Sequence, residues 1–157
     1  TNSQFDPSLS WDDVAAIRKQ WGGKLIIKGI LDAEDAKAAV NIGADAIIVS
    51  NHGGRQLDGA MSAIAALPAI VDAVGNKAEV WMDSGIRSGQ DVLRAIALGA
   101  KATLIGRAFL YGLGARGQDG VRETLEIIQK ELEISMALCG HTSIDTVTTD
   151  IILKKTF

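Results

Sequence analysis

The sequence contains a repeated βα unit, and this repeat limits the possible folds more than any other feature. Residues 24–49 align without gaps with residues 80–105, and each copy reads as a strand, Gly-Ile, a polar loop, a helix, Gly-Ala and a second strand. Gly43 and Gly99 occupy equivalent positions at the predicted helix ends, where the chain commonly adopts a positive φ. Repeats of this kind are typical of a (β/α)8 barrel or a doubly wound parallel sheet.

Short apolar runs alternate with segments of helical periodicity along the chain. Strands are predicted at Leu25–Lys28, Ala46–Ser50, Glu79–Asp83 and Ala102–Ile105. Helices are predicted at Trp11–Gln20 (with Ser10 as its N-cap), Asp32–Ile42, Ser62–Val74, Ser88–Leu98 and from about Gly120 to Leu138.

The number of units indicates an incomplete barrel. A barrel is favoured over a doubly wound sheet because tandem units of equal size close without a reversal of strand order. Eight βα units need about 250 residues, whereas this chain has 157. Four parallel strands would also leave two open edges, which stable domains avoid. We therefore expect an α/β fold in which residues 1–157 form half, four βα units, of a TIM (β/α)8 barrel.

A polar motif follows the second predicted strand directly. Residues 50–58 read Ser-Asn-His-Gly-Gly-Arg-Gln-Leu-Asp, and in a barrel they would lie at the C-terminal rim, where active sites occur. The imidazole of His52 suits general-base chemistry near neutral pH. The planar guanidinium of Arg55 suits a carboxylate. In isolation such a motif is more often a polar turn, but its place in a repeated βα array favours a catalytic site.

A second group of residues follows the third and fourth strands. Asp-Ser-Gly-Ile-Arg occupies residues 83–87, and Gly106-Arg107 follows the last strand. Barrels often hold a phosphate at the loops after their last two strands, with backbone N–H groups, a helix N-terminus and a cation. The alternative is a pair of surface arginines near helix caps. The position of both loops favours a phosphate site.

Three further features have a structural interpretation. Residues 112–117 match the spacing of a dinucleotide-binding fingerprint, but they follow a predicted short helix, Ala108–Tyr111, instead of a strand. We therefore predict a turn there. Cys139 follows an apolar stretch and is predicted to be a small buried residue. His141 is expected in a loop.

Composition argues against several classes of function. A formal net charge of −3 gives no reason to expect a nucleic-acid partner. No apolar run approaches the roughly 20 residues that span a bilayer. The single cysteine cannot form an internal disulfide, so a reducing, cytoplasmic location is expected. No metal site is expected.

With these motifs identified, the chain resembles the FMN-dependent L-2-hydroxy-acid oxidase and dehydrogenase family, which includes glycolate oxidase, L-lactate dehydrogenase, mandelate dehydrogenase and flavocytochrome b2. The similarity runs from about Asp6 to about Leu138. The motif at residues 50–58 is highly specific to this family, whereas the phosphate loops also occur in other FMN barrels. The resemblance implies that the chain is the C-terminal half of the barrel.

The resemblance implies a role for each site residue. His52 would be the catalytic base, and Arg55 would bind the substrate carboxylate. Lys28, which ends the first strand and would otherwise be a snorkelling structural lysine, would contact the isoalloxazine ring together with Ser50. The ribityl chain and phosphate would be held by Asp83, Ser84, Gly85, Ile86, Arg87, Gly106 and Arg107. The family usually has glycine at the position of Ser84, so a positive φ there would add modest strain.

The resemblance also implies partners. Members are longer than this chain, and Thr1–Ser8 reads as a linker without an initiator methionine, so we expect the N-terminal half of the same enzyme as a separate chain. A 2-hydroxy acid would be the substrate, and a homo-oligomer is expected because many relatives are tetramers. Some bacterial relatives associate peripherally with the inner membrane, which is a possible location of the full-length enzyme.

The predicted reaction is oxidation of an L-2-hydroxy acid to a 2-oxo acid with FMN as cofactor. The specific acid, the electron acceptor and the choice between a carbanion and a hydride route stay open at this point. One alternative is another FMN barrel, which would leave His52 and Arg55 without a purpose. The other is a non-catalytic half-barrel that binds a phosphorylated ligand or a partner.

Overall fold

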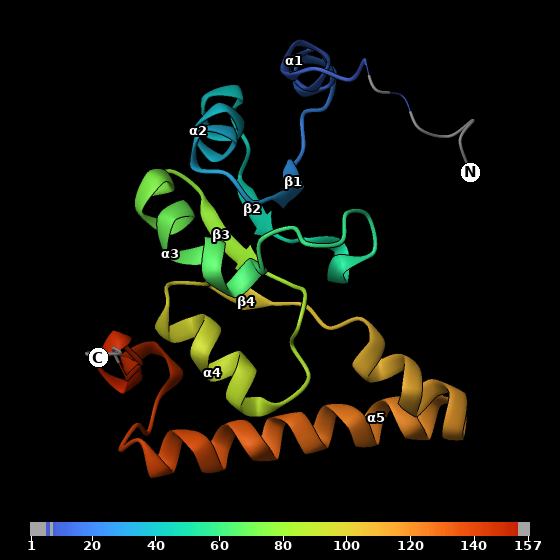
Figure 1. Cartoon of the computed structure of the whole chain (residues 1–157), viewed down its shortest axis with the longest axis vertical. Helices are drawn as coiled ribbons and strands as arrows, with labels where there is room; N and C mark the ends of the chain where they lie inside the picture. The colour runs from blue at the N-terminus through green and yellow to red at the C-terminus, as the bar shows by residue number, and fades with distance from the viewer. Residues whose placement is uncertain (1–5, 7, 154–157) are drawn as a thin grey trace.

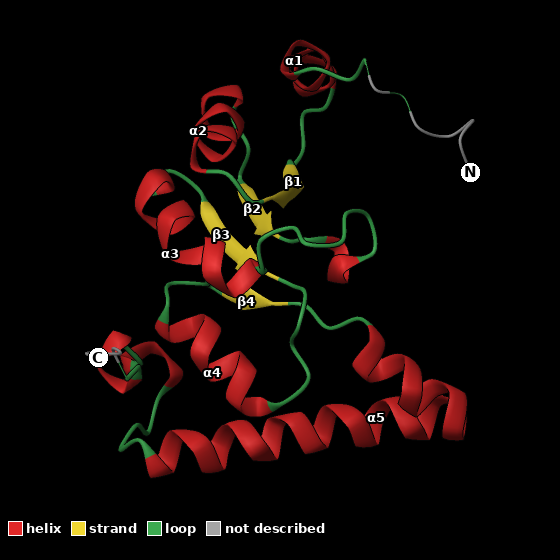
Figure 2. Ribbon diagram, in the orientation of Figure 1, coloured by secondary structure: helices red, strands yellow, loops and turns green. Residues whose placement is uncertain are grey.

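A computed structural model describes residue 6 and residues 8–153, so most of the predicted linker at residues 1–8 lies outside the described residues. Strands and helices alternate as predicted (Figures 1 and 2). The strands are β1 (Ile26–Ile30), β2 (Ala46–Val49), β3 (Glu79–Met82) and β4 (Ala102–Thr103). The helices are α1 (Trp11–Gln20), α2 (Ala33–Ile42), α3 (Ala63–Val74), α4 (Gly89–Ala97) and α5 (Arg107–Leu138), with short 3-10 turns η2 (His52–Gly54), η3 (Ile144–Thr146) and η4 (Thr149–Ile151).

The four strands form one parallel sheet in the order β1-β2-β3-β4. Each βα unit therefore adds its strand beside the previous one, and the carboxyl ends of all four strands meet at one edge of the sheet. The register pairs Lys28 with Ile48 and Ile48 with Trp81. It is interrupted in β1 between Lys28 and Ile30, where Gly29 has a φ of +102°. This irregularity is why β1 continues beyond its predicted end at Lys28.

Local sequence signals explain where the helices begin and end. The Asp32 side chain accepts hydrogen bonds from the backbone N–H groups of Glu34 and Asp35 at the start of α2. Gly43 ends that helix with a φ of +93°, and Gly99, at the equivalent position after α4, has a φ of +103°. The predicted conformations of both glycines are confirmed.

The core lies between the sheet and the helices on one of its faces. Figure 1 shows α2 and α3 on the same side of the sheet. Alternate strand residues point towards these helices and are almost fully buried, notably Ile47, Val49, Val80 and Met82. On the opposite face Ala46 and Ile48 of β2 are buried as well, but Ile26 is 41% exposed and Trp81 is only partly buried. The sheet therefore has one covered apolar face and one that the described chain covers poorly.

The C-terminal region differs from the prediction in three respects. The turn predicted at residues 112–117 is confined to Arg116 and Gly117, where α5 bends between two helical segments, because the first segment stays helical up to Ala115. Gly112 allows the two segments to pack closely, since a Cβ atom at this position would collide with the Gly120 carbonyl oxygen. Cys139 is exposed at the end of α5, not buried. β4 is also shorter than predicted and ends at Thr103.

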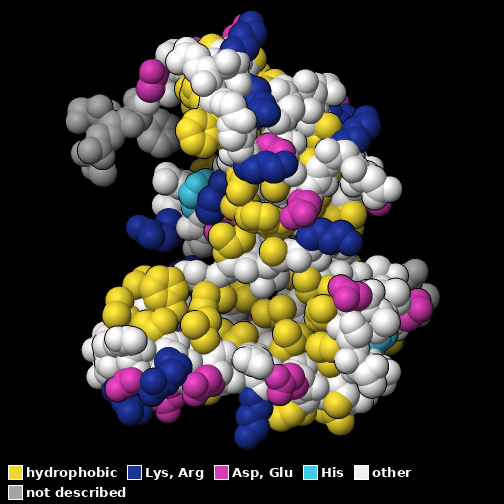
Figure 3. Space-filling view, turned by 180° about the vertical axis from the view of Figure 1, so that it is seen from behind, with side chains coloured by type: hydrophobic (Ala, Val, Ile, Leu, Met, Phe, Trp, Pro, Cys, Tyr) yellow, Lys and Arg dark blue, Asp and Glu magenta, His cyan; other side chains and the backbone are white. Residues whose placement is uncertain are grey.

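Apolar side chains are conspicuous on the surface of α5. Figure 3 shows hydrophobic side chains spread over the lower part of the molecule, where α4 and α5 lie. The large exposed ones on α5 are Leu110, Tyr111, Leu113, Leu125, Ile127, Ile134 and Leu138. Among residues 6 and 8–153, no helix combines the length and the apolar character needed to cross a bilayer.

Candidate active site

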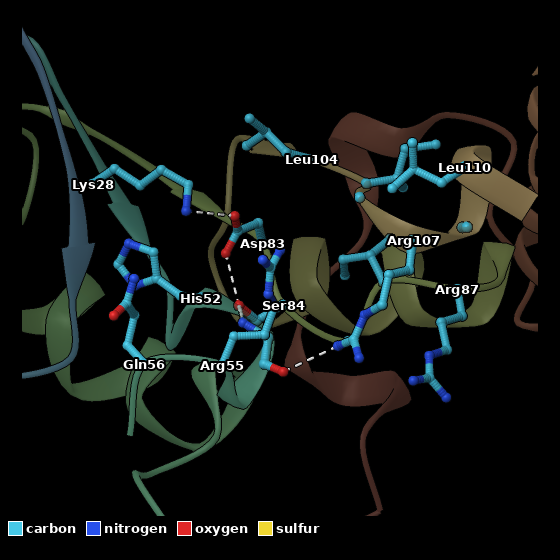
Figure 4. Close-up of a pocket in the computed structure, with 16 residues that line it drawn as sticks. Lys28, His52, Arg55, Gln56, Asp83, Ser84, Arg87, Leu104, Arg107 and Leu110 are labelled. Carbon is cyan, nitrogen blue, oxygen red and sulfur yellow. Dashed lines mark hydrogen bonds and ion pairs between the residues drawn. The ribbon is translucent and has the colours of Figure 1, made fainter. Parts of the chain in front are cut away.

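A cavity of about 400 Å³ opens at the carboxyl ends of the strands. This volume is within the usual range for small-molecule sites. Figure 4 shows Lys28 and His52 at one end of the cavity and Arg87 and Arg107 at the other. All the predicted site residues except Ser50 line it, namely Lys28, His52, Arg55, Asp83, Ser84, Gly85, Ile86, Arg87, Gly106 and Arg107.

An ion pair joins the ends of β1 and β3 within the cavity. The Lys28 Nζ lies 2.8 Å from Asp83 Oδ2 and donates a hydrogen bond to Ser50 Oγ at 3.0 Å. Ser50 is only 1% exposed and does not line the cavity, so its predicted contact with a cofactor stays a prediction. Its hydroxyl helps to hold the Lys28 ammonium in place.

The electrostatics of Asp83 favour its ionised form. Burial alone would raise the pKa of this carboxyl, but hydrogen bonds from Lys28 and the neighbouring serine hydroxyls, with the Lys28 charge, outweigh burial and hold the pKa below its usual range. At neutral pH the Asp83 carboxylate therefore pairs with the Lys28 ammonium. The ion pair therefore fixes the position of the Lys28 ammonium in the cavity.

The turn that carries His52 has an unusual backbone. His52, Gly53 and Gly54 have φ values of +56°, +68° and +73°, and His52 is one of two non-glycine residues with positive φ in the described chain. Such a conformation in a non-glycine residue needs support from its surroundings. The His52 N–H donates to Ser50 Oγ at 3.1 Å, and Arg107 Nη2 donates to the Gly53 carbonyl oxygen at 3.0 Å. These bonds hold His52 at the cavity.

Sequence reasoning missed the importance of Gly29. A Cβ atom built at this position would lie 2.9 Å from Cε1 of His52. The bulge in β1 therefore leaves space that the imidazole occupies. The repeat had already aligned Gly29 with Gly85, but nothing in the sequence indicated which side chain would lie against it. Gln56, Leu104, Ile105, Ala108 and Leu110 also line the cavity and were not predicted as site residues.

The His52 ring and the Arg55 guanidinium are available to a ligand. Among the residues that the structure describes, neither group makes a hydrogen bond or an ion pair through its side chain, and both residues are exposed. An imidazole can accept and release a proton, and a guanidinium can bind a carboxylate in a bidentate manner. At this end of the cavity, Arg55 can therefore orient a carboxylic acid, and His52 can take a proton from that acid or return one to it.

The other end of the cavity suits an anion. Gly85 and Gly106 have open space where a Cβ atom would be, so a ligand can approach the backbone closely at both positions. Arg87 and Arg107 contribute two positive charges, and α5 begins at Arg107. A helix N-terminus beside arginines is favourable for a phosphate. No group of three His, Cys, Asp or Glu residues in the described ranges is arranged to hold a metal ion.

Comparison with known sequences places these features in a wider context. The family model described as FMN-dependent dehydrogenase matches residues 1–154. An L-lactate dehydrogenase of Caulobacter sp. (strain K31) is 55% identical over 152 residues, which cover 97% of this chain and 40% of that protein. An L-lactate dehydrogenase of Pseudomonas putida (strain GB-1) is 56% identical over 98% of this chain and 40% of its own length. The chain thus spans about two fifths of these relatives.

Solved structures give the same result. A mandelate oxidase variant with a monooxide FMN adduct has a TM-score of 0.86 and 49% identity, covering 92% of this chain and 46% of that chain. Mandelate oxidase with benzoyl-formic acid also has a TM-score of 0.86 and 49% identity, covering 92% of this chain and 43% of that one. The four-stranded parallel sheet and its helices thus match a part of these enzymes.

Proposed function

The chain belongs to the FMN-dependent dehydrogenase family, and on that premise we propose that it provides the catalytic base, the substrate-binding arginine and most of the phosphate site for oxidation of an L-2-hydroxy acid. One observation carries this proposal above the others. A single cavity holds an available imidazole and an available guanidinium at one end and two arginines with open glycines at the other. The cavity thus has one end for an acid and one for a phosphate.

The residues at the cavity fit FMN. Arg87, Arg107 and the backbone of Gly106 would hold its phosphate, and the loop that begins at Asp83 would hold the ribityl chain. Lys28, fixed by Asp83, would lie near the ring system, where a cation favours negative charge on the cofactor. When bound, FMN supplies a two-electron acceptor next to the substrate.

The side chains at the other end would handle the substrate. Arg55 binds its carboxylate and so orients the α-carbon towards the imidazole. A ring nitrogen of His52 takes one proton, either from the α-carbon (carbanion route) or from the hydroxyl (hydride route). In both routes the substrate becomes a 2-oxo acid by losing two electrons, which bound FMN would accept, and two protons, one taken by His52 and the other passing to the flavin or to solvent. The imidazolium then releases its proton to solvent before the next turnover.

The uncovered face of the sheet favours a missing half-barrel. β1 and β4 are edge strands in the described chain, and parallel sheets are normally buried on both faces. Ile26 and the partly buried Trp81 lie on the uncovered face. We propose that the chain is the C-terminal half of a (β/α)8 barrel, and that four further strands, on a separate N-terminal chain, cover this face and complete the cavity. The resulting enzyme would form a homo-oligomer.

Residues 1–157 expressed alone are therefore expected to associate, aggregate or melt without cooperativity. The uncovered face and two strand edges would be exposed to water, and such surfaces favour association. Size-exclusion chromatography and thermal melting, with and without the co-expressed N-terminal half, measure this directly. A monomeric, cooperatively melting 157-residue protein would contradict the half-barrel proposal.

Removal of the Arg107 guanidinium should weaken FMN binding more than catalysis at saturating FMN. Loss of charge-assisted hydrogen bonds of about 1.5–3 kcal/mol predicts a rise in the FMN dissociation constant of about 10- to 150-fold for Arg107→Ala. The measurement is titration of the apo-form of the assembled protein, meaning this chain together with the remaining barrel strands. Arg94→Ala is the matched control, because Arg94 lies on α4 and pairs with Asp91 away from the cavity. Equal affinities in all three proteins would place the phosphate elsewhere.

The assembled protein tests the proposed reaction. We expect it to oxidise at least one short or aromatic L-2-hydroxy acid in the presence of an artificial electron acceptor, with the 2-oxo acid as product. D-enantiomers should react poorly, because Arg55 and His52 fix the substrate on one face. A protein that binds FMN but oxidises none of these acids would favour another FMN barrel, and one that binds no FMN would favour a non-catalytic half-barrel.

A further inference from the structure

We propose that Ser84 is a positioning residue that fixes the backbone of His52, an inference that rests on the proposed function of His52 as the base. Ser84 lies in the loop after β3, whereas His52 lies in the turn after β2. The side chain of Ser84 links these two loops of the site through the hydrogen bonds described below (Figure 4).

The hydrogen bonds of Ser84 act on the peptide next to the base. Ser84 Oγ accepts a hydrogen bond from the Gly53 N–H at 3.0 Å. This N–H belongs to the peptide that joins His52 to Gly53, so the bond limits rotation on the carboxyl side of His52. Ser50 Oγ limits rotation on the amino side, because it accepts from the His52 N–H at 3.1 Å. The two hydroxyls together hold His52 from both sides.

The same hydroxyl connects this turn to the Lys28–Asp83 pair. Ser84 Oγ donates to Asp83 Oδ1 at 2.8 Å, while the other oxygen of Asp83 binds Lys28 at 2.8 Å. Ser84 Oγ also lies 3.4 Å from Ser50 Oγ, so the two hydroxyls that hold the His52 turn are in contact. The base and the cation proposed to face the cofactor are thereby held in one network.

No other group in the described chain holds the Gly53 N–H. Ser50 Oγ already accepts from Lys28 Nζ and from the His52 N–H. Arg107 reaches the Gly53 carbonyl oxygen, not the N–H, and its guanidinium is also proposed to bind the phosphate. Loss of the Ser84 hydroxyl would therefore leave the Gly53 N–H without an acceptor, and the peptide after His52 would be held only through its carbonyl oxygen, which accepts from the Arg55 N–H at 3.4 Å.

The backbone conformation of Ser84 allows a test that distinguishes a role of its hydroxyl from a role of its φ angle alone. Its φ is +69°, a value that glycine adopts with less strain than serine. If only the conformation of the loop mattered, Ser84→Gly would equal or improve on serine. If the hydroxyl matters, Ser84→Gly and Ser84→Ala should lose activity to a similar extent, even though one relieves strain and the other does not.

The test compares Ser84→Gly and Ser84→Ala with Ser88→Ala in the FMN-loaded assembled protein. Ser88 caps α4 at the far end of the same loop through the Asp91 N–H and does not line the cavity. We expect kcat to fall about 5- to 30-fold in both Ser84 variants, as for one lost neutral hydrogen bond, with KM changed by less than about twofold. Hydrogen exchange should rise in the segment 51–57 of the Ser84 variants only, and Ser88→Ala should keep the kinetics of the unsubstituted protein.

The outcomes distinguish this role from the proposed function. An active unsubstituted protein together with an equally active Ser84→Gly variant would overturn the role of Ser84 alone. A loss confined to KM, or unchanged hydrogen exchange in segment 51–57, would also overturn it. An unsubstituted protein that oxidises no L-2-hydroxy acid would overturn the proposed function, and the role of Ser84 would fall with it.

Discussion

Replacement of His52 by glutamine is expected to remove nearly all turnover while FMN stays bound. Glutamine keeps a polar side chain of similar reach but cannot take up a proton near neutral pH. Loss of a general base typically costs about 10²- to 10⁴-fold in rate. Because His52 lies at the end of the cavity away from Arg87 and Arg107, the affinity for FMN should change little. Stopped-flow measurement of flavin reduction, with FMN content determined separately, gives both quantities.

The second histidine of the chain is the matched control. His141 lies after α5 and its Nδ1 is 3.0 Å from the Thr146 hydroxyl, outside the cavity. His141→Gln should therefore retain the kinetics of the unsubstituted protein. A folded, FMN-loaded His52→Gln variant with more than about a tenth of the original kcat would show that another group is the base, since general-base loss costs at least about 10²-fold.

Substitution of Arg55 by lysine is expected to reduce kcat/KM by about 2–4 kcal/mol, or roughly 30- to 1000-fold. Lysine keeps the positive charge but cannot reproduce the two parallel hydrogen bonds of a guanidinium to a carboxylate. The loss should be seen mainly in KM for the acid, because Arg55 binds the substrate and takes no part in proton transfer. Steady-state kinetics over a range of acid concentrations separate the two parameters.

A conservative exchange elsewhere controls for the loss of an arginine. Arg122 lies on the exposed surface of α5 and pairs with Asp119 and Glu126. Exposed pairs of this kind contribute little to stability, so Arg122→Lys should leave both kcat and KM unchanged. If Arg55→Lys gave the same kinetics as Arg122→Lys, the carboxylate would be bound by a different residue.

Much of the fold could be predicted from the sequence because local signals and the repeat agree. The predicted span of α1 is confirmed, and α2, α3 and α4 differ by a residue at one or both ends because the N-cap residues, and the C-cap Leu98 of α4, were counted as helical. Gly43 and Gly99 adopt the positive φ that their places in the repeat require. Most residues predicted for the site lie together at one cavity for the same reason, since parallel strands bring their carboxyl ends together whatever the distance in the chain.

The errors came from contacts that no local pattern records. Gly112 was predicted to lie in a turn, but it lies within the first helical segment of α5 and allows that segment to pack closely against Gly120. Cys139 follows an apolar stretch, yet the end of α5 projects from the molecule, and Leu138 beside it is 84% exposed. In the site, the space that Gly29 leaves for His52 depends on a bulge in β1. Such features need the three-dimensional arrangement of segments that are distant in the sequence.

The most direct test of the central claim is anaerobic mixing of the FMN-loaded assembled protein with L-2-hydroxy acids, followed by the visible absorbance of the flavin and by analysis of the product. We expect that at least one L-acid bleaches the flavin, that one equivalent of 2-oxo acid forms for each flavin, and that the flavin of the His52→Gln variant bleaches at least about 100-fold more slowly. A flavin that keeps its absorbance with every L-acid tested, or one that bleaches at the original rate in the His52→Gln variant, would contradict the proposed function.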